Sequence, residues 1–258
     1  NTDEVERLLQ LVWEKHETCI GDLLGSDHAL LATIRSDLRN IRDILKTVSL
    51  MKWQATRIAE LVAGHGETWS AQVLAQHLGY TYMDARQVIV VQEDDNNNFT
   101  VEWKESQRRL NAILPTSSHF CMTGYICVNT EGVATTLQRD GSDYSAAIVG
   151  RLLQAESVSI WTDVDGVLSA DPRRVPLAQV LQGVSYKEAM ELAYFGAKVI
   201  HPKTMQPLVN PPIPLYIRNT FNAAAPGTRI FTTRSSSTHR DQVVCGFTCI
   251  AGMALIYV

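Results

Sequence analysis

The sequence predicts an α/β protein with a largely parallel sheet. Apolar, strand-like runs alternate along much of the chain with segments whose apolar residues recur at helical spacing. Strand-like runs give way to loops rich in Gly, Asp, Ser and Arg at 135–147 and 161–174. Because ligands of open α/β sheets bind outside the carboxyl ends of the strands, these two loops are the first candidates for a functional site.

Composition excludes several classes of function. With 258 residues and 45% hydrophobic content, the chain can bury a substantial core. A formal net charge of -4 and the lack of a basic stripe argue against a nucleic-acid partner. No apolar run has the length of a membrane span and no signal peptide is visible, so no membrane partner is expected. Five cysteines without CxxC spacing favour reduced intracellular thiols, and seven scattered histidines show no metal-ligand spacing.

The N-terminal third is predicted to be helical. Helical spacing over 1–50 predicts two amphipathic helices joined by a turn at 21–27. A second helical pair is predicted at 58–62 and 69–78, on either side of the run G-H-G-E at 64–67. Glu67 would then enter the first turn of a helix, where its charge is favoured and could hold a substrate ammonium. A plain helix-turn-helix explains the same spacing.

The middle of the chain predicts the alternation of strands and helices that defines the fold class. Residues 80–86 and 88–91 are strand-like, and the asparagine-rich run 92–100 is typical of a polar surface loop. Helical spacing over 101–114 leads to a further predicted strand at 119–126.

The first loop ends in a predicted helix that could bind an amino acid. Ser142 is placed as the N-cap of this helix, whose backbone N–H groups favour an anion. The guanidinium of Arg139 suits a carboxylate or phosphate, and Asp143 could complement an ammonium. These two charges, four residues apart, match the two charged ends of an amino acid. A capped surface helix with one ion pair remains the alternative.

The second loop follows a short β-rich run at 158–161, which is typical of a buried parallel strand. Thr162, Asp163 and Asp165 lie at its end, and Gly166 permits a tight turn.

A calcium loop beginning at Asp163 does not fit this segment. Its sixth position would be Leu168 instead of glycine, and its twelfth would be Arg174 instead of glutamate. Carboxylates together with Arg173 better suit a nucleotide and its magnesium ion, which proteins hold through few carboxylates plus phosphates.

The C-terminal part begins with a strong helix signal. Ser185 and Glu188 form a capping box that predicts a helix through Tyr194. Gly196 interrupts this helix, and the adjacent Lys198 is a candidate phosphate-binding cation, although most lysines are solvated surface residues. Further strands are predicted at 213–218 and 229–232.

Five blocks, taken in order, resemble the aspartate kinases of the amino-acid-kinase family. The resemblance is closest to the kinase portion of the bifunctional aspartokinase/homoserine dehydrogenases of plants and bacteria. The blocks are G-H-G-E (64–67), R-D-G-S-D-Y-S-A (139–146), W-T-D-V-D-G-V (161–167), S-A-D-P-R (169–173) and F-G-A-K-V-I-H-P (195–202). The second of these blocks, in the form R-D-G-S-D-Y-S-A-A, looks more plant-like than the R-N-G-S-D-Y-S-A of bacterial bifunctional enzymes. The likeness runs from about Val62 to the end of the chain.

This resemblance implies an α/β/α sandwich that uses ATP and Mg²⁺ to phosphorylate the β-carboxylate of L-aspartate. It places four residues at the aspartate, namely Glu67, Arg139, Ser142 and Asp143. It places five at the nucleotide, namely Thr162, Asp163, Asp171, Arg173 and Lys198. Among these, Lys198, Arg139 and Asp143 would be catalytic, with Lys198 offsetting charge on the transferring phosphoryl group.

Two departures from the family pattern affect the expected activity. The opening strands and the K-F-G-G-[TS]-S loop, whose lysine contacts the phosphates, do not precede Asn1. We therefore expect a fold that lacks its first strands, and a chain that alone has weak or no activity. Leu168 stands where the family usually has a tyrosine near the adenine.

The resemblance also implies a domain plan. We expect a kinase domain at 1–233, a linker at 234–242 and, at 243–258, the start of an ACT regulatory domain that helps form dimers or higher oligomers. A homoserine dehydrogenase domain follows in some relatives. The compartment would be the plastid stroma in a plant or alga and the cytoplasm otherwise.

Two alternatives stay open at this point. One is another amino-acid kinase that acts on glutamate or acetylglutamate. The other is a non-catalytic homologue or fragment that binds aspartate or nucleotide.

Overall fold

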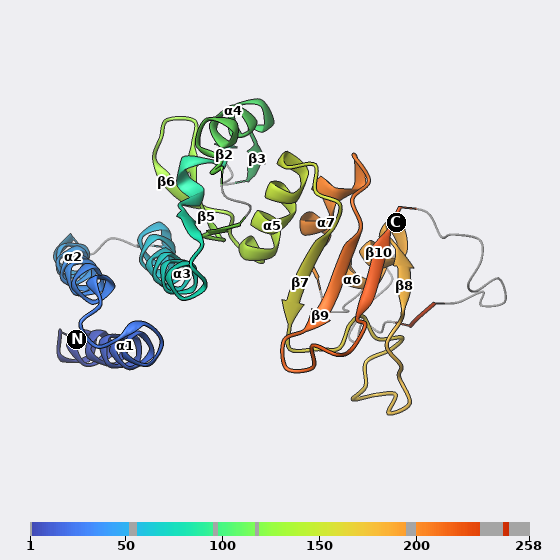
Figure 1. Cartoon of the computed structure of the whole chain (residues 1–258), viewed down its shortest axis with the longest axis horizontal. Coiled ribbons are helices and arrows are strands. Elements are labelled where there is room, and N and C mark those ends of the chain that lie inside the picture. The colour runs from blue at the N-terminus through green and yellow to red at the C-terminus, as the bar shows by residue number, and fades with distance from the viewer. Residues whose placement is uncertain are drawn as a thin grey trace, which may run out of the picture. The chain divides into compact units, whose positions relative to one another are not determined.

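The computed structural model describes residues 2–51, 56–94, 98–116, 119–194, 200–232 and 245–247. The chain divides into two compact units, Asn1–Gln138 and Arg139–Val258 (Figure 1). Both units combine helices with parallel and antiparallel strands, which confirms the predicted α/β class. None of the helices in the described ranges is long and apolar enough to cross a membrane.

Three long helices open the first unit: α1 (Thr2–Leu24), α2 (Ala29–Met51) and α3 (Thr56–Leu78). Their apolar faces form a common cluster, with Ile20 and Ile34 fully buried at its centre. The two opening helices were predicted, but the turn between them is shorter than expected. Helix α1 continues through Gly21 to Leu24, and the chain then turns at Gly25, whose φ of +103° suits glycine.

The predicted break at 64–67 is wrong, because α3 passes through this run as one helix. The sequence shows two glycines there, and glycine lowers helix stability by only about 1 kcal/mol relative to alanine. Tertiary packing against α1, α2 and the strands outweighs this cost.

The strands of the first unit form two small sheets. β1 (Thr81–Met83) pairs in parallel with β4 (Phe120–Met122). A four-stranded sheet has the order β3-β2-β5-β6, in which β2 and β5 are parallel and the outer pairs antiparallel. The bounds of its members are β2 (Val90–Glu93), β3 (Phe99–Val101), β5 (Ile126–Asn129) and β6 (Ala134–Thr136).

Two connecting elements complete this unit, a 3-10 turn at Ala85–Gln87 and α4 (Trp103–Ile113). The helix agrees with the predicted helical run. The strand predicted at 119–126 is instead two strands, because the chain turns at 123–125 and β5 begins only at Ile126.

The second unit contains one four-stranded sheet with the order β7-β9-β10-β8. β7 and β9 are parallel, as are β10 and β8, while β9 and β10 are antiparallel. The strands are β7 (Val158–Thr162), β8 (Gly183–Ser185), β9 (Leu215–Asn219) and β10 (Thr228–Phe231). The helices are α5 (Gly141–Leu152), α6 (Tyr186–Tyr194) and α7 (Pro202–Val209).

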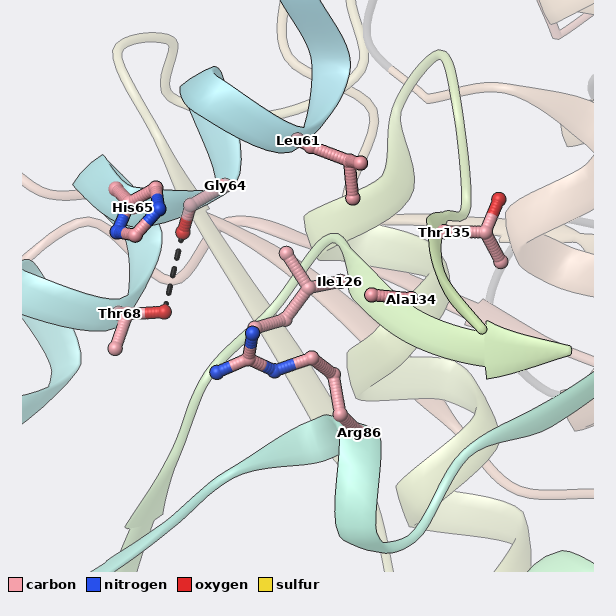
Figure 2. A pocket seen from close by; sticks show the side chains of 8 residues that line it. All are labelled: Leu61, Gly64, His65, Thr68, Arg86, Ile126, Ala134 and Thr135. Carbon is pink, nitrogen blue, oxygen red and sulfur yellow. Dashed lines mark hydrogen bonds between the residues drawn. The ribbon is translucent and has the colours of Figure 1, made fainter. Parts of the chain in front are cut away.

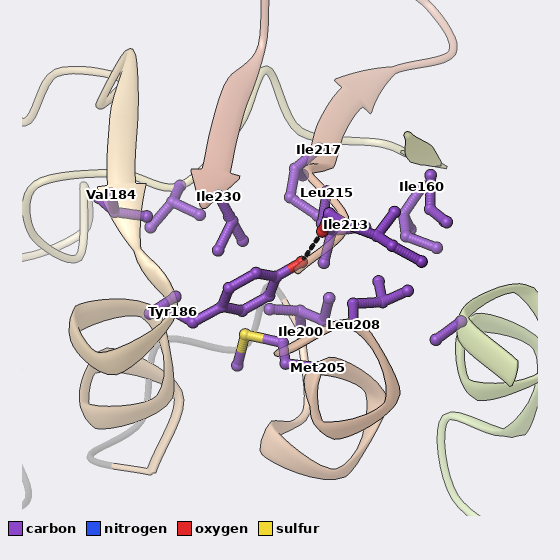
Figure 3. Packing of buried hydrophobic residues seen from close by; sticks show 14 residues of the cluster. Ile160, Val184, Tyr186, Ile200, Met205, Leu208, Ile213, Leu215, Ile217 and Ile230 are labelled. Atoms are coloured by element: carbon purple, nitrogen blue, oxygen red, sulfur yellow. Dashed lines mark hydrogen bonds between the residues drawn. The ribbon is translucent and has the colours of Figure 1, made fainter. Parts of the chain in front are cut away.

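The core of the second unit lies between the sheet and its helices. Figure 3 shows strand residues such as Ile217 and Ile230 directed toward Tyr186 of α6 and Met205 of α7. The ring of Tyr186 is buried, and its hydroxyl donates a hydrogen bond to the carbonyl of Ile213. This bond satisfies the polar end of the ring inside an apolar cluster. The register of β7 against β9, from Val158↔Leu215 to Thr162↔Asn219, then aligns the carboxyl ends of both strands.

Candidate functional site

Helix α3 carries the G-H-G-E run against the sheet of its own unit. A Cβ on Gly64 would lie 2.7 Å from Cγ2 of Ile126, so only glycine lets α3 approach β5 this closely. Gly66 has nothing within 4 Å of its Cβ position, so packing does not require glycine there. Close backbone approach therefore accounts for the glycine at position 64 but not for the one at position 66.

A small cavity lies beside this contact. Figure 2 shows Leu61, Gly64 and Thr68 of α3 on one side and Arg86, Ile126 and Ala134 on the other. Its volume is about 20 Å³, which is space for about one water molecule and far less than a small-molecule site needs. The hydroxyl of Thr68 donates to the carbonyl of Gly64 at 3.1 Å and remains within the helix.

Glu67 lies in the interior of α3, so the expected helix N-terminus does not act on it. Its carboxylate is partly buried, and this burial raises its pKa above the usual value. On the adjacent turn, the indole of Trp69 donates to Asp37 of α2 at 2.8 Å. Helix α3 is thus anchored on two sides around Glu67.

The start of α5 holds three of the four predicted aspartate residues. Its N-cap is Asp140, in a left-handed conformation with φ 54° and without a side-chain cap bond. The prediction that Ser142 caps the helix is wrong, because the helix already begins at Gly141 and the amide of Tyr144 bonds the carbonyl of Asp140 at 3.0 Å. Ser142 instead lies exposed in the first turn.

The charges at this helix start have opposite signs and different environments. The side chain of Arg139 is 83% exposed, and its Nε lies 3.6 Å from a carboxylate oxygen of Asp140. Asp143 is partly buried, and burial followed by the nearby charge of Asp140 raises its pKa. An exposed guanidinium just before the helix and a partly desolvated carboxylate in its first turn could bind a carboxylate and an ammonium, respectively.

The loop after β7 holds two aspartates in unlike surroundings. Asp163 is exposed and accepts one bond, at 3.2 Å, from the hydroxyl of Thr162. Asp165 accepts two, from the side-chain amides of Asn219 at 2.8 Å and Asn222 at 3.1 Å. One carboxylate is therefore free for a ligand cation, whereas the other is bound within the protein.

Thr228 of β10 holds the backbone at Val167, two residues after Asp165. Its buried hydroxyl accepts a bond from the amide of Val167 at 2.8 Å and donates to the carbonyl of Leu181. Gly166 has φ +142°, and a Cβ there would lie 2.5 Å from that hydroxyl oxygen.

Asp171 and Arg173, two more of the predicted nucleotide residues, lie further along the same loop. Arg173 forms a two-pronged ion pair with Asp171, with nitrogen to oxygen distances of 3.0 and 2.9 Å. This pair holds the pKa of Asp171 below its usual value, and the arginine side chain is 83% exposed. Leu168, by contrast, pairs with Val180 in an antiparallel bridge.

The structure groups these predicted residues by unit. Glu67 belongs to the first unit, and the other described candidates belong to the second. Lys198 lies outside the described residues. In the ranges that the structure describes, no cluster of three or more His, Cys, Asp or Glu could hold a metal ion.

The sequence did not predict that Asn219 and Asn222 bind Asp165, or that Thr228 binds the amide of Val167. A usable signal was present in N-T-F-N at 219–222, because two asparagines follow directly after a predicted parallel strand.

Known proteins are similar to this chain over most of its length. The chain is 41% identical over 261 residues to a bifunctional aspartokinase/homoserine dehydrogenase 2, chloroplastic, from Arabidopsis thaliana, covering 97% of this chain and 28% of that protein. It therefore spans little more than a quarter of the length of that relative.

Two solved structures share the fold. Aspartate kinase from Clostridium acetobutylicum has a TM-score of 0.77 and 25% identity, with coverage of 93% of this chain and 51% of that one. Aspartokinase III from E. coli in complex with aspartate and ADP has a TM-score of 0.73 and 26% identity, with coverage of 91% and 52%. The sequence profile of the amino acid kinase family matches residues 9–219. The chain therefore belongs to the amino acid kinase family.

Proposed function

We propose that this chain is the kinase portion of an aspartate kinase, which transfers the γ-phosphoryl group of ATP to the β-carboxylate of L-aspartate. The observation that carries the proposal is the start of α5, where the exposed Arg139 and the partly buried Asp143 complement an amino acid. Similarity to proteins named aspartokinase, and to one solved with aspartate and ADP, supports aspartate as the substrate.

In this proposal Arg139 binds a substrate carboxylate, Asp143 holds the ammonium and Ser142 adds a polar contact. Glu67 is assigned to the substrate by resemblance alone. A β-carboxylate oxygen attacks the γ-phosphorus, the bond to the β–γ bridging oxygen breaks, and ADP leaves with its electron pair. No covalent enzyme intermediate is needed, because phosphoryl transfer depends on positioning and charge neutralisation.

The nucleotide would lie at the loop after β7. Thr162, Asp163 and Arg173 are at least partly exposed there, which fits a nucleotide with bound Mg²⁺. The ion would neutralise phosphate charge, with Asp163 as the free carboxylate on its side. Asp171 orients Arg173 through their ion pair, and Lys198 is assigned to the transferring phosphoryl group by resemblance.

The wider assignment follows the named relatives. Aspartyl phosphate formation would be the first step toward lysine, threonine and methionine, under feedback control through an ACT domain that also supports dimers or higher oligomers. The domain plan of 1–233, 234–242 and 243–258 is part of this proposal. The chloroplastic names of the plant relatives favour the plastid stroma if the source is a plant or alga.

An acyl-phosphate assay tests the activity. This chain and the natural polypeptide that carries it are each incubated with Mg·ATP and L-aspartate, L-glutamate or N-acetylglutamate, and product is trapped with hydroxylamine. We expect aspartyl hydroxamate from the natural polypeptide. Product from N-acetylglutamate alone would identify that compound, instead of aspartate, as the substrate. Aspartate binding without any product would favour a non-catalytic homologue.

Arg139→Ala tests the substrate assignment. We expect aspartate affinity to fall roughly 10- to 100-fold, the loss typical of a hydrogen bond to a charged group, with little change in ATP affinity. Calorimetric titration of each ligand measures both values. Equal losses for aspartate and ATP would remove Arg139 from the substrate site.

A further inference from the structure

We infer that Asp165, together with Asn219 and Asn222, is a positioning group that presents Asp163 to the nucleotide. The inference rests on the proposed kinase function and adds residues that the family resemblance did not supply. Its basis is the set of contacts between the loops that follow β7 and β9.

The two loops begin at the same level of the sheet. Thr162 and Asn219 are register partners at the carboxyl ends of parallel strands. The ladder continues one step further, because the amide of Thr220 donates to the carbonyl of Thr162 at 2.8 Å. Asp163 therefore follows directly after the last backbone contact between the strands.

Asp165 closes the loop on the other side of Asp163. One of its carboxylate oxygens accepts from the side-chain amides of both asparagines, at 2.8 and 3.1 Å. The carbonyl oxygen of the Asn219 side chain accepts from the amide of Phe221 at 2.9 Å. That bond fixes which end of the Asn219 amide faces Asp165, so a donor meets the carboxylate.

Asp163 thus lies between two anchored neighbours. Thr162 is held by the backbone ladder, and Asp165 is held by its two side-chain bonds. Among the residues that the structure describes, the Asp163 carboxylate accepts a hydrogen bond from the adjacent hydroxyl of Thr162, and its side chain is exposed. The carboxylate of Asp165 positions the loop, which leaves that of Asp163 available for the cation that accompanies the nucleotide.

Preorganised charge is the main contribution of a protein to phosphoryl transfer, so loosening this loop should affect the nucleotide first. In the natural polypeptide, we expect Asp165→Ala to raise the KM for Mg·ATP roughly 10- to 100-fold, the loss associated with bonds to a charged group. The KM for aspartate should change little. Asp165→Asn keeps an acceptor oxygen and should retain more ATP affinity than Asp165→Ala.

Asn219→Ala and Asn222→Ala remove one donor each and should raise the same KM by smaller factors. Thr220→Ala is the matched control in the same loop, because its backbone bond to Thr162 survives and its exposed side chain is lost. If Asp165 only stabilised the fold, its loss would lower the amount of active enzyme without raising the KM for Mg·ATP relative to the KM for aspartate. An unchanged KM for ATP in Asp165→Ala, or an equal rise for aspartate, would overturn the inference.

Direct titration with Mg·ADP separates this inference from the proposed function. If the natural polypeptide binds Mg·ADP but phosphorylates no aspartate, the proposed function fails, while weaker nucleotide binding by Asp165→Ala still supports the positioning role. If aspartate is phosphorylated and Asp165→Ala binds Mg·ADP normally, only the positioning role fails. Absence of both binding and activity would overturn both.

Discussion

Asp140 has a left-handed backbone conformation and lies beside two charged residues that we assign to the substrate. Gln138 and Asp140, on either side of Arg139, have φ values of 60° and 54°. Such conformations cost of order 1 kcal/mol or more for most residues, whereas Asp and Asn tolerate them best. This tolerance explains why an aspartate can stand at the N-cap of α5.

Asp140→Asn should therefore keep the helix start while changing its electrostatics. The charge of Asp140 contributes to the raised pKa of Asp143, so its removal should lower that pKa. NMR titration of the Asp143 carboxyl carbon measures the change. Asp22→Asn, at an exposed site on α1, serves as the control and should leave Asp143 unaffected. A pKa of Asp143 that stays constant or rises in Asp140→Asn would contradict the expectation.

The two glycines of α3 provide a matched pair of variants. Gly66→Ala should stabilise the protein by roughly 0.5–1 kcal/mol, because alanine favours helix and the Cβ enters open space. Gly64→Ala should destabilise it, because overpacking against Ile126 costs roughly 1–3 kcal/mol and exceeds the helical gain. Urea unfolding of both variants measures the difference.

A double variant identifies the cause. If the Cγ2 methyl of Ile126 is the obstacle, Gly64→Ala should cost less in an Ile126→Ala background than in the wild type. Additive effects of the two substitutions would show that the clash at 2.7 Å is not the source of the loss.

At the scale of a single element, α6 depends on its capping box. The amide of Ser185 donates to Glu188 at 2.7 Å, and the amide of Glu188 donates to the Ser185 hydroxyl at 3.2 Å. We expect Ser185→Ala to lower the free energy of unfolding by roughly 0.5–2 kcal/mol and Ser185→Thr by much less, because threonine also caps. Thermal and urea unfolding would test this, and equal losses in both variants would exclude the cap as the cause.

Elements with local signals were predictable from the sequence. The box at Ser185 and Glu188 spans four residues, and the helix that it predicts is observed as α6 (Tyr186–Tyr194). The continuity of α3 was not predictable, because Gly64 is explained by Ile126, which lies 62 positions along the chain.

The candidate site likewise contains residues that the sequence could predict and residues that it could not. Motif residues such as Asp163 and Arg173 could be named from the sequence because each motif is contiguous. Asp165 was noticed only as a member of its loop, since its partners Asn219 and Asn222 are 54 and 57 residues away. Contacts of that kind depend on the register of β7 and β9, which the sequence alone does not specify.

At the scale of the whole molecule, substrate binding should depend on pH through two carboxylates. Burial raises the pKa of Glu67 and, together with Asp140, that of Asp143. Under the proposed function each carboxylate acts on the substrate in its ionised form, so aspartate affinity should fall as pH decreases through these raised pKa values. The loss should begin at a higher pH than for ordinary carboxylates, whose pKa values are about 4.

Folding stability should respond to the same two groups with the opposite sign. Protonation removes the cost of a buried charge, so their contribution favours the folded state more as pH falls through their raised pKa values. Calorimetric aspartate titrations and urea unfolding, both measured between about pH 4 and pH 7, would compare the trends. A midpoint for affinity at or below the ordinary carboxyl pKa would contradict the assignment.

The contact between Gly166 and Thr228 constrains how this protein can change during evolution. The Thr228 hydroxyl occupies the space that any side chain at position 166 would need, and it also binds the backbone on both sides of that space. Losing this hydroxyl would not free the position, because a Cβ at 166 would still lie 2.9 Å from Cγ1 of Val180 and the φ of +142° strains any side chain. Evolution is therefore expected to retain Gly166 even in a lineage that replaces Thr228 and so loses the support of Val167.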